Sequence, residues 1–464
     1  MTTLVAAFAR SAAKHSARTA LIDGTGAAHT FSHLQALAET YAAGWYARGV
    51  RPGDRVLVAM GIGPDLYASL AALWSLGATA VLPEPAMGLA GVRTAVDATH
   101  PKFFCAAGPY RWIRLLLPRL WRARLLTPGK GCDAAPPSHG ADPDSVALIS
   151  FTSGTTGIPK AIPRTHAFLM AQWKAVAPLL HSDGEEIDLV TFPVFVLINL
   201  AEGRTSVLPN WKMSRLAGLD PASLVGWISA NKCTRALLPP ALCDKLIEAQ
   251  DTGQLRQIFT GGGPVFPDVI RRLQDISDGL KITTVYGSTE AEPIAHAQTV
   301  EEGYGLFAGH PVDAVRLRIV DSEIQIAGDH VNRGYLDPAR DQETKVVEGD
   351  TIWHRTGDAG QLDEQGRLWL LGRVGDEVTI DTGVLHPFAI ETAARMWPGV
   401  DQVALMALNK TAVLVVAGKA EHGEAWRSRA ATFGIADVRH VPSIPLDRRH
   451  NSKVDRTALR KLLI

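Results

Sequence analysis

Residues 150–166 carry the strongest structural signal in the chain and read Ser150-Phe151-Thr152-Ser153-Gly154-Thr155-Thr156-Gly157-Ile158-Pro159-Lys160-Ala161-Ile162-Pro163-Arg164-Thr165-His166. They follow the apolar run 146–149, which predicts a buried strand leading into a polar turn. Glycines let the backbone approach a ligand, and hydroxyls with successive N–H groups can surround phosphate oxygens beside the charge of Lys160. Pro159 stands before that lysine, so the stretch differs from a Walker A loop. On composition alone, an ordinary Ser/Thr/Gly turn is the alternative.

The composition indicates a folded protein of more than one domain. A chain of 464 residues is too long for a single hydrophobic core, and about two to four domains are expected. The apolar share of 46% and the charged share of 20% are typical of globular proteins rather than disordered ones. Since the formal net charge is zero, no global field attracts nucleic acid or an anionic membrane, and we expect no nucleic-acid partner.

The cysteines and the apolar runs indicate the compartment. The four cysteines lack CxxC spacing, so we interpret them as thiols in a reducing environment rather than as a metal site or disulfide framework. The first residues have no basic segment followed by an apolar core, and no apolar run approaches the roughly 20 residues of a membrane span. The sequence therefore predicts a soluble, cytoplasmic enzyme.

The order of apolar segments predicts a mixed α/β fold. A strand at 55–60, a helix at 65–76 and a strand at 80–83 form a βαβ pattern, which implies a parallel sheet. From about residue 312 the pattern changes to short alternating strands, which predicts a β-rich subdomain. Beyond Gly375-Asp376, a tail of roughly ninety residues combines two apolar strands with two helical segments.

Residues 111–126 interleave five arginines with Trp and Leu side chains. This pattern predicts a basic amphipathic helix. Such a helix either presents a solvated face whose arginine stems cover the core, or docks on a membrane or on a partner such as another pathway enzyme.

Two other kinds of segment are candidates for ligand contact. The run 188–200 is continuously apolar, and it is either core or the wall of an acyl pocket, with Phe192, Phe195, Val196 and Asn199 as candidate pocket residues.

Polar clusters follow strands at Gly261-Gly262-Gly263-Pro264 and at Tyr286-Gly287-Ser288-Thr289-Glu290. The second cluster joins an aromatic ring, small residues and one carboxylate, as a nucleotide–Mg²⁺ site requires. For the glycines alone, a tight turn is an equal explanation.

Five separated stretches resemble, in order and spacing, the core motifs of the acyl-adenylate-forming superfamily, which includes acyl-CoA synthetases, adenylation domains and luciferases. They lie at 152–160, 261–264, 286–290, 355–358 with 372–373, and at Lys453 in Asn451-Ser452-Lys453-Val454-Asp455-Arg456. The resemblance covers nearly the whole chain. It implies a large N-terminal domain at 1–374, with its β-rich subdomain at about 312–374, and a small mobile C-terminal domain at 375–464.

The resemblance also implies roles for individual residues. Thr152, Ser153, Thr155, Thr156 and Lys160 would hold the ATP phosphates, Gly262, Gly263 and Tyr286 would frame adenine, and Asp358 and Arg373 would hold the ribose. Further cofactor-binding residues would be Gly154, Gly261, Gly287 and Ser288. Glu290 and Thr155 would bind Mg²⁺. Lys453, Glu290 and Thr289 would be catalytic, with Lys453 bridging the carboxylate and the α-phosphate. Two anions meet in this reaction, so cations and positioning supply most of the catalysis.

Two features favour one branch of this superfamily. The segments 191–195 and 203–209 lack the Pro-x-x-His usual in CoA-forming members, and the ending 447–453 is similar to that of the β-lactone synthetases. That branch implies adenylation of a 3-hydroxy acid followed by attack of its own hydroxyl. The alternatives are an acyl-CoA ligase, for which CoA would be a further substrate, a ligase that loads a carrier protein, and a non-catalytic nucleotide- or acyl-binding protein. Ala161, Leu200 and 376–380 depart from the branch's usual residues.

Overall fold

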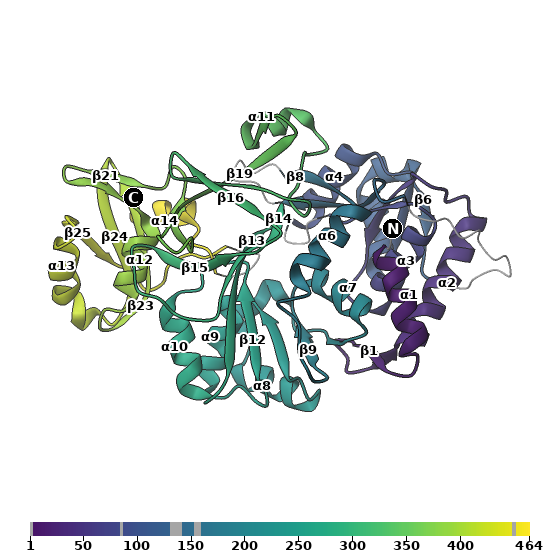
Figure 1. The fold of residues 1–464 in the computed structure, drawn as a ribbon, viewed down its shortest axis with the longest axis horizontal. Helices are drawn as coiled ribbons and strands as arrows, with labels where there is room; N and C mark the ends of the chain where they lie inside the picture. Colours follow the sequence, from purple (N-terminus) through teal and green to yellow (C-terminus); the bar gives the residue numbers. More distant parts are fainter. Residues whose placement is uncertain (1–2, 84–86, 130–141, 153–158, 448–451) are drawn as a thin grey trace.

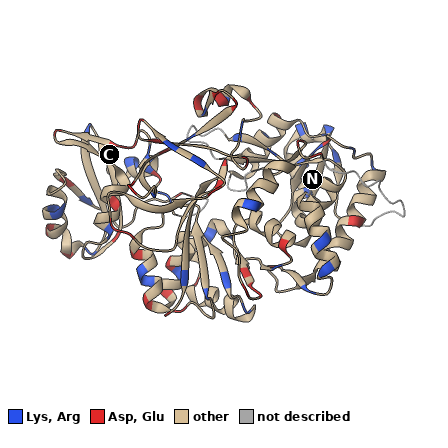
Figure 2. Ribbon diagram, in the orientation of Figure 1, with Lys and Arg blue, Asp and Glu red and all other residues tan. Residues whose placement is uncertain are grey.

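The computed structural model describes residues 3–83, 87–129, 142–152, 159–447 and 452–464 (Figure 1). Its strands form two large sheets, one small sheet and a hairpin. Positive and negative side chains are interspersed along the ribbon (Figure 2), in line with the net charge of zero. Within the described residues, no helix combines the length and the apolar character that crossing a bilayer requires.

The first sheet has the strand order β6-β5-β3-β4-β7-β8. Its strands are β3 (Arg55–Ala59), β4 (Thr79–Val81), β5 (Phe103–Ala106), β6 (Arg124–Leu126), β7 (Val146–Thr152) and β8 (Lys160–Thr165). The first five strands are parallel, and β8 runs antiparallel to β7. Helices α3 (Pro64–Ser75) and α4 (Gly88–Thr99) connect them, which confirms the predicted βαβ unit. The carboxyl ends of the parallel strands therefore meet at one edge.

The second sheet is 14-stranded and joins a parallel half to an antiparallel half. The parallel half contains β1 (Thr19–Ile22), β9 (Ile187–Val190), β10 (Thr205–Val207), β11 (Arg235–Leu238), β12 (Gln257–Gly261) and β13 (Lys281–Ser288), with β2 (Ala28–Thr30) pairing antiparallel to β1. The antiparallel half contains β14 (Ala291–Ala297), β15 (Leu306–Pro311), β16 (Arg316–Val320), β17 (Glu323–Ala327), β18 (Lys345–Glu348), β19 (Thr351–Leu362) and β20 (Leu368–Arg373). Strands of the predicted β-rich segment thus continue a sheet that starts in the α/β part.

Helices cover both large sheets. They are α1 (Leu4–Lys14), α2 (Phe31–Ala47), α6 (His166–Val176), α7 (Pro193–Glu202), α8 (Pro221–Ala230), α9 (Pro240–Ala249), α10 (Pro267–Ile276) and the short α11 (Asp341–Thr344). The largest apolar core lies where α1, α2, α3 and α7 pack against the sheets. Trp74 of α3 is buried in it and donates its indole N–H to the carbonyl of Ala147 at 2.8 Å, which ties α3 to the first sheet.

The tail forms a smaller unit at one end of the molecule (Figure 1). Its strands β23 (Val400–Leu408), β24 (Thr411–Gly418) and β25 (Asp437–His440) make a three-stranded sheet, and β21 (Val378–Ile380) pairs with β22 (Gly383–Leu385). Helices α12 (Pro387–Arg395), α13 (Gly423–Ala431) and α14 (Arg456–Leu463) complete it. The fold is therefore mixed α/β, with a large sheet-rich N-terminal domain and a smaller C-terminal domain.

Two local expectations differ from the structure. Residues 111–126 do not form one helix: 3₁₀ turns η2 (Gly108–Trp112) and η3 (Pro118–Arg122) flank a short α5 (Ile113–Leu116), and β6 follows. Pro118 has no N–H to continue α5 and restricts Leu117 to extended backbone, so the helix ends there. The candidate pocket wall at 188–200 is also divided between two elements, because Pro193 begins α7 three residues after β9 ends.

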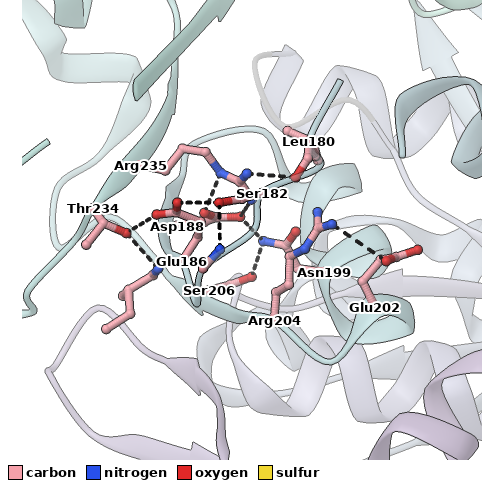
Figure 3. Close-up of polar contacts among 12 residues, drawn as sticks. Leu180, Ser182, Glu186, Asp188, Asn199, Glu202, Arg204, Ser206, Thr234 and Arg235 are labelled. Carbon is pink, nitrogen blue, oxygen red and sulfur yellow. Dashed lines mark hydrogen bonds and ion pairs between the residues drawn. The ribbon is translucent and has the colours of Figure 1, made fainter. Parts of the chain in front are cut away.

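A buried polar network joins the parallel strands beside α7 (Figure 3). Arg235 donates to both carboxylate oxygens of Asp188, at 2.8 and 2.7 Å, and to the carbonyl of Leu180 at 2.8 Å. Asn199 of α7 donates to Asp188 at 2.9 Å and to Ser206 at 3.0 Å. Both members of the ion pair are fully buried, so each depends on the other for compensation of its charge.

Candidate active site

A cleft of about 1970 Å³ lies between the sheets and the small domain. Segments from the carboxyl edge of the first sheet line it, together with the loops after β9, β12 and β13 and with the ending of the chain. Carboxyl edges of parallel strands are where ligands of α/β proteins bind. The cleft brings together Thr152, Lys160, Glu290, Asp358, Arg373 and Lys453, which are far apart in the sequence.

The phosphate-loop residues open the cleft at the first sheet. Thr152 ends β7 and pairs in register with Lys160 at the start of β8. The hydroxyl of Thr152 is buried and has no hydrogen-bond partner within the described residues. The ammonium of Lys160 lies 5.2 Å from the ring centre of Tyr335 and 4.0 Å from a carboxylate oxygen of Glu343. Ser153, Gly154, Thr155 and Thr156 lie outside the described residues.

Glu290 is fixed by contacts from distant parts of the chain. The hydroxyl of Tyr335 donates to its carboxylate at 3.0 Å, and the backbone N–H of Asn332 donates to its carbonyl at 2.7 Å. Next to it, the guanidinium of Arg164 on β8 donates to the carbonyl of Thr289 at 2.6 Å. These bonds hold the turn 289–290 against the phosphate-loop hairpin and leave the Glu290 carboxylate in the cleft.

The half-buried Lys345 and the buried His354 add two basic groups near this carboxylate. The ammonium of Lys345 lies 3.2 Å from Nδ1 of His354 and 5.3 Å from the ring centre of Tyr335. Burial lowers the pKa of Lys345 to about 8, although the nearby Glu290 charge opposes this shift. Burial and the Lys345 charge lower the pKa of His354 to about 3, so His354 is neutral at pH 7. Burial and Glu290 both raise the pKa of Tyr335, which keeps its hydroxyl a donor.

Asp358 contacts Tyr286 and Arg373, two residues that the family resemblance assigns to the nucleoside of ATP. The hydroxyl of Tyr286 donates to one of its carboxylate oxygens at 2.7 Å, and the guanidinium of Arg373 donates to the other at 2.8 Å. Asp358 and Arg373 are register partners on β19 and β20, which explains their proximity across 15 residues. Burial and Asp358 together raise the pKa of Tyr286 well above its usual value.

The glycine segment permits two close approaches. A side chain at Gly261 would meet the carbonyl of Val285 on the paired strand at 2.3 Å, and Gly262 has a left-handed φ of +78°. A side chain at Gly263 would meet the hydroxyl of Ser452 at 2.2 Å. The absence of a Cβ at Gly263 therefore admits the ending of the C-terminal domain to this edge of the cleft.

In that ending, hydrogen bonds join Lys453 to Asp447. The carboxylate of Asp447 accepts the backbone N–H groups of Ser452 and Lys453 at 3.1 and 2.9 Å. The N–H of Asp447 donates to the carbonyl of Lys453 at 2.8 Å, and Leu446 forms a bridge with Val454. Lys453 is exposed and lines the cleft. Residues 448–451, which carry part of the β-lactone-synthetase resemblance, lie outside the described residues.

The apolar end of the cleft differs from the expected pocket wall. Phe192 lines it, but Phe195, Val196 and Asn199 do not. Because the segment is a helix, these three side chains turn away: Phe195 and Val196 join the apolar core, and Asn199 belongs to the Asp188–Arg235 network (Figure 3). The wall is completed instead by Met60, Leu66, Tyr67, Leu70, Leu82 and Leu197.

Several of these site residues were not predicted. Tyr335, Lys345 and His354 reach Glu290 or Lys160 from 45 or more positions away in the sequence, so no local spacing connected them to the site. The α3 residues of the pocket have ordinary apolar helical spacing, which does not distinguish pocket wall from core.

The cleft has hydrogen-bond donors that suit ATP and a carboxylate that suits Mg²⁺. The buried hydroxyls of Thr152 and Ser288 have no partner within the described part of the chain, and such donors suit phosphate or sugar oxygens. No group of three or more His, Cys, Asp or Glu side chains among the described residues is arranged to hold a metal by itself. Mg²⁺ commonly binds through one or two carboxylates together with substrate phosphates, and Glu290 fits that manner of binding.

Comparisons with known proteins agree with this geometry. Residues 8–336 match the AMP-binding enzyme family. An olefin β-lactone synthetase from Stenotrophomonas maltophilia is 27% identical, over 92% of this chain and 90% of that protein. A feruloyl-CoA synthase from an Amycolatopsis species is 27% identical, over 82% of this chain and 81% of its own length. The solved structure of O-succinylbenzoate coenzyme A synthetase (MenE) from Bacillus subtilis, in complex with ATP and magnesium ion, has a TM-score of 0.80 at 20% identity and covers 98% of this chain and 99% of its own.

The family match covers more than half of the chain, and the two relatives named above align with most of its length. The chain belongs to the AMP-binding enzyme family and is an ATP-dependent adenylate-forming ligase.

Proposed function

We propose that this ligase activates a 3-hydroxy fatty acid as its acyl-adenylate and cyclises it to a β-lactone, releasing AMP and diphosphate. The observation that carries the first step is the convergence of Lys160, Glu290, Asp358 and Lys453 on one cleft. In that step a carboxylate oxygen attacks the α-phosphorus of ATP, the bond to the β-phosphate bridging oxygen breaks, and diphosphate leaves. Lys160 and Lys453 would offset the charge of the two reacting anions.

The residues in hand have separable tasks in that step. Lys453 would contact the reacting carboxylate and α-phosphate, and Asp447 would position it by accepting the backbone N–H groups of Ser452 and Lys453. Asp358 and Arg373 would orient the ribose. Glu290, oriented by the Tyr335 hydroxyl, would hold Mg²⁺, which when bound neutralises phosphate charge.

Cyclisation needs the acid's own 3-hydroxyl next to the activated carbonyl. The hydroxyl oxygen attacks the acyl carbon, the bond to AMP breaks, and the hydroxyl proton is released. An intramolecular nucleophile requires only a pocket that folds the chain and excludes water. The apolar wall of α3 and Phe192 supports a hydrocarbon substrate. The likeness to olefin β-lactone synthetases along 92% of the chain supports this second step.

A CoA ligase is the second candidate, and the feruloyl-CoA synthase likeness favours it. Incubation with ATP, Mg²⁺ and a panel of 3-hydroxy fatty acids, with and without CoA, separates the two. The proposal expects a product lighter than the acid by one water, formed without CoA and showing the carbonyl band of a strained lactone. A thioester that forms only with CoA would establish the ligase instead, and the Lys453→Ala variant serves as the blank.

A further inference from the structure

Four large apolar side chains are exposed together on the segment 108–122, named here the arginine–tryptophan patch. Trp112 and Trp121 are each 59% exposed, and Leu115 and Leu116 are each 65% exposed. Single exposed apolar residues are common on proteins, but four within ten positions form a surface that water solvates poorly.

Basic groups surround these side chains. Arg111, Arg114, Arg119 and Arg122 alternate with them, and the sequence has no Asp or Glu between Asp97 and Asp133. Arg119 pairs with Asp97 of α4. Because the chain as a whole has zero net charge, the positive character of this surface is local rather than a general property of the protein.

The patch has a preformed shape. Arg114 donates to the carbonyl of Trp121 at 3.0 Å, and the indole of Trp121 donates to the carbonyl of Arg114 at 2.8 Å. The guanidinium of Arg111 lies 5.6 Å from the ring centre of Trp112. These contacts fold the turns around Pro118 back on themselves and hold both tryptophans at the surface, so little ordering is required on docking.

The patch adjoins the cleft at its first residues. The segment leaves β5 at the carboxyl edge of the first sheet, the edge that also supplies Met60 and Leu82, and crosses to the opposite edge, where β6 begins parallel to β5. Tyr110 and Ile62 both line the cleft and remain exposed, at 42% and 49%. The first sheet and β6 lie at the end of the molecule opposite the C-terminal domain (Figure 1), so docking there leaves the Lys453 ending free.

We propose that the arginine–tryptophan patch docks on the interface of an anionic phospholipid bilayer. Tryptophan prefers the headgroup region, leucine enters the acyl boundary, and arginine pairs with lipid phosphate while its stem stays apolar. A protein partner would need acidic groups facing these arginines, whereas a bilayer containing anionic lipid provides both the charge and the apolar phase. Use of this docking to receive fatty substrates through the Tyr110 side of the cleft rests on the proposed function; the docking itself does not.

Sedimentation with lipid vesicles tests the docking without any catalytic readout. The protein is expected to sediment with phosphatidylcholine vesicles that contain phosphatidylglycerol, more weakly with phosphatidylcholine alone, and less at raised salt. The double variant Leu115→Asp, Leu116→Asp should lower partitioning by about tenfold or more, since two exposed leucines that would enter the bilayer are replaced by charges. The control Val347→Asp, Leu462→Asp changes two exposed apolar residues on β18 and α14 and should bind as the parent does.

Three results would overturn the proposal. The first is no sedimentation of the parent with phosphatidylglycerol vesicles at low salt, and the second is an equal loss of sedimentation in the patch and control variants. The third is self-association of the parent through the patch, which light scattering would reveal if the patch variant alone is monomeric. Acyl-adenylate formation from detergent-dispersed acid should be equal in the parent and both variants, so a failure of the proposed function appears separately.

Discussion

Arg395 of α12 and Asp268 of α10 form a two-pronged ion pair across the junction of the two domains, with both donor–acceptor distances at 2.7 Å. The guanidinium also lies 4.7 Å from the ring centre of Phe266, which packs edge-on against Phe388 of α12. Together with the Gly263–Ser452 approach, this contact holds the C-terminal domain where Lys453 lines the cleft.

Replacing Arg395 should therefore weaken adenylation without removing any group from the reaction. In Arg395→Ala, two charge-assisted hydrogen bonds are lost, and acid-dependent exchange of labelled diphosphate into ATP should fall by about tenfold to a hundredfold. Arg256→Ala removes an exposed arginine paired with Glu186 and should leave exchange unchanged. Equal exchange in Arg395→Ala and the parent would show that the pair does not maintain this arrangement.

Lys453 and Asp447 should support the reaction in different ways, Lys453 by its charge and Asp447 by positioning Lys453. Lys453→Ala removes a cation from the transition state, and acyl-adenylate formation should fall by about 10²–10³. Asp447→Ala should also lower the rate, because the N–H groups of Ser452 and Lys453 lose their acceptor. Asp447→Asn keeps an oxygen acceptor and should recover most of the activity, whereas equal loss in both Asp447 variants would contradict a positioning role.

Tyr335 should set the Mg²⁺ requirement. In Tyr335→Phe, the Glu290 carboxylate loses a 3.0 Å hydrogen bond, and the Mg²⁺ concentration for half-maximal activity should rise about fivefold. Tyr304→Phe changes an exposed tyrosine and serves as the control. If the Mg²⁺ concentration for half-maximal activity is unchanged in Tyr335→Phe, then either Glu290 is not the metal ligand or Tyr335 does not support it.

His354 should make the folded state sensitive to acid. Its folded pKa of about 3 lies below the unfolded value of 6.5, so the unfolded state binds more protons between these pH values. This contribution is complete above about pH 6.5 and is lost as pH falls toward 3, with a slope of about 1.4 kcal/mol per pH unit. Urea unfolding of the parent and of His354→Asn across pH 4–7 measures the difference, and parallel curves for the two proteins would contradict it.

The Asp188–Arg235 pair should show the cost of an uncompensated buried charge. Arg235→Met leaves Asp188 with only Asn199 as a donor among these contacts, and the free energy of unfolding should drop by about 3–5 kcal/mol. The double variant Arg235→Met, Asp188→Leu should be more stable than Arg235→Met alone in chemical denaturation. A double variant less stable than the single one would contradict this account of the network.

The sequence predicted those parts of the site that are read within one segment. The strand before the phosphate loop, the βαβ unit and the polar cluster 286–290 are local patterns, and the structure brings described residues of all three to one cleft. The division into 1–374 and 375–464 remains a prediction. In the structure, Asp376 pairs with Arg456 at 2.9 Å, inside the smaller domain.

The predictions that differ from the structure depended on single proline residues. The contacts that were not predicted join residues from separate segments of the chain. Pro118 divides the expected basic helix, and Pro193 starts the helix that turns Asn199 toward Asp188. Lys345 and His354 meet because they are register partners on β18 and β19, and Tyr335 reaches Glu290 from the loop after β17, so no local pattern indicated either contact.

Isotope labelling of the substrate tests the central claim most directly. A 3-hydroxy acid with ¹⁸O in both carboxylate oxygens is incubated with ATP and Mg²⁺ in the absence of CoA, and AMP and the organic product are analysed by mass. The account predicts one label in the phosphate of AMP and one in a product that has lost the other. Unlabelled AMP, or a dehydrated product that keeps both labels as an alkenoic acid does, would contradict adenylation followed by cyclisation.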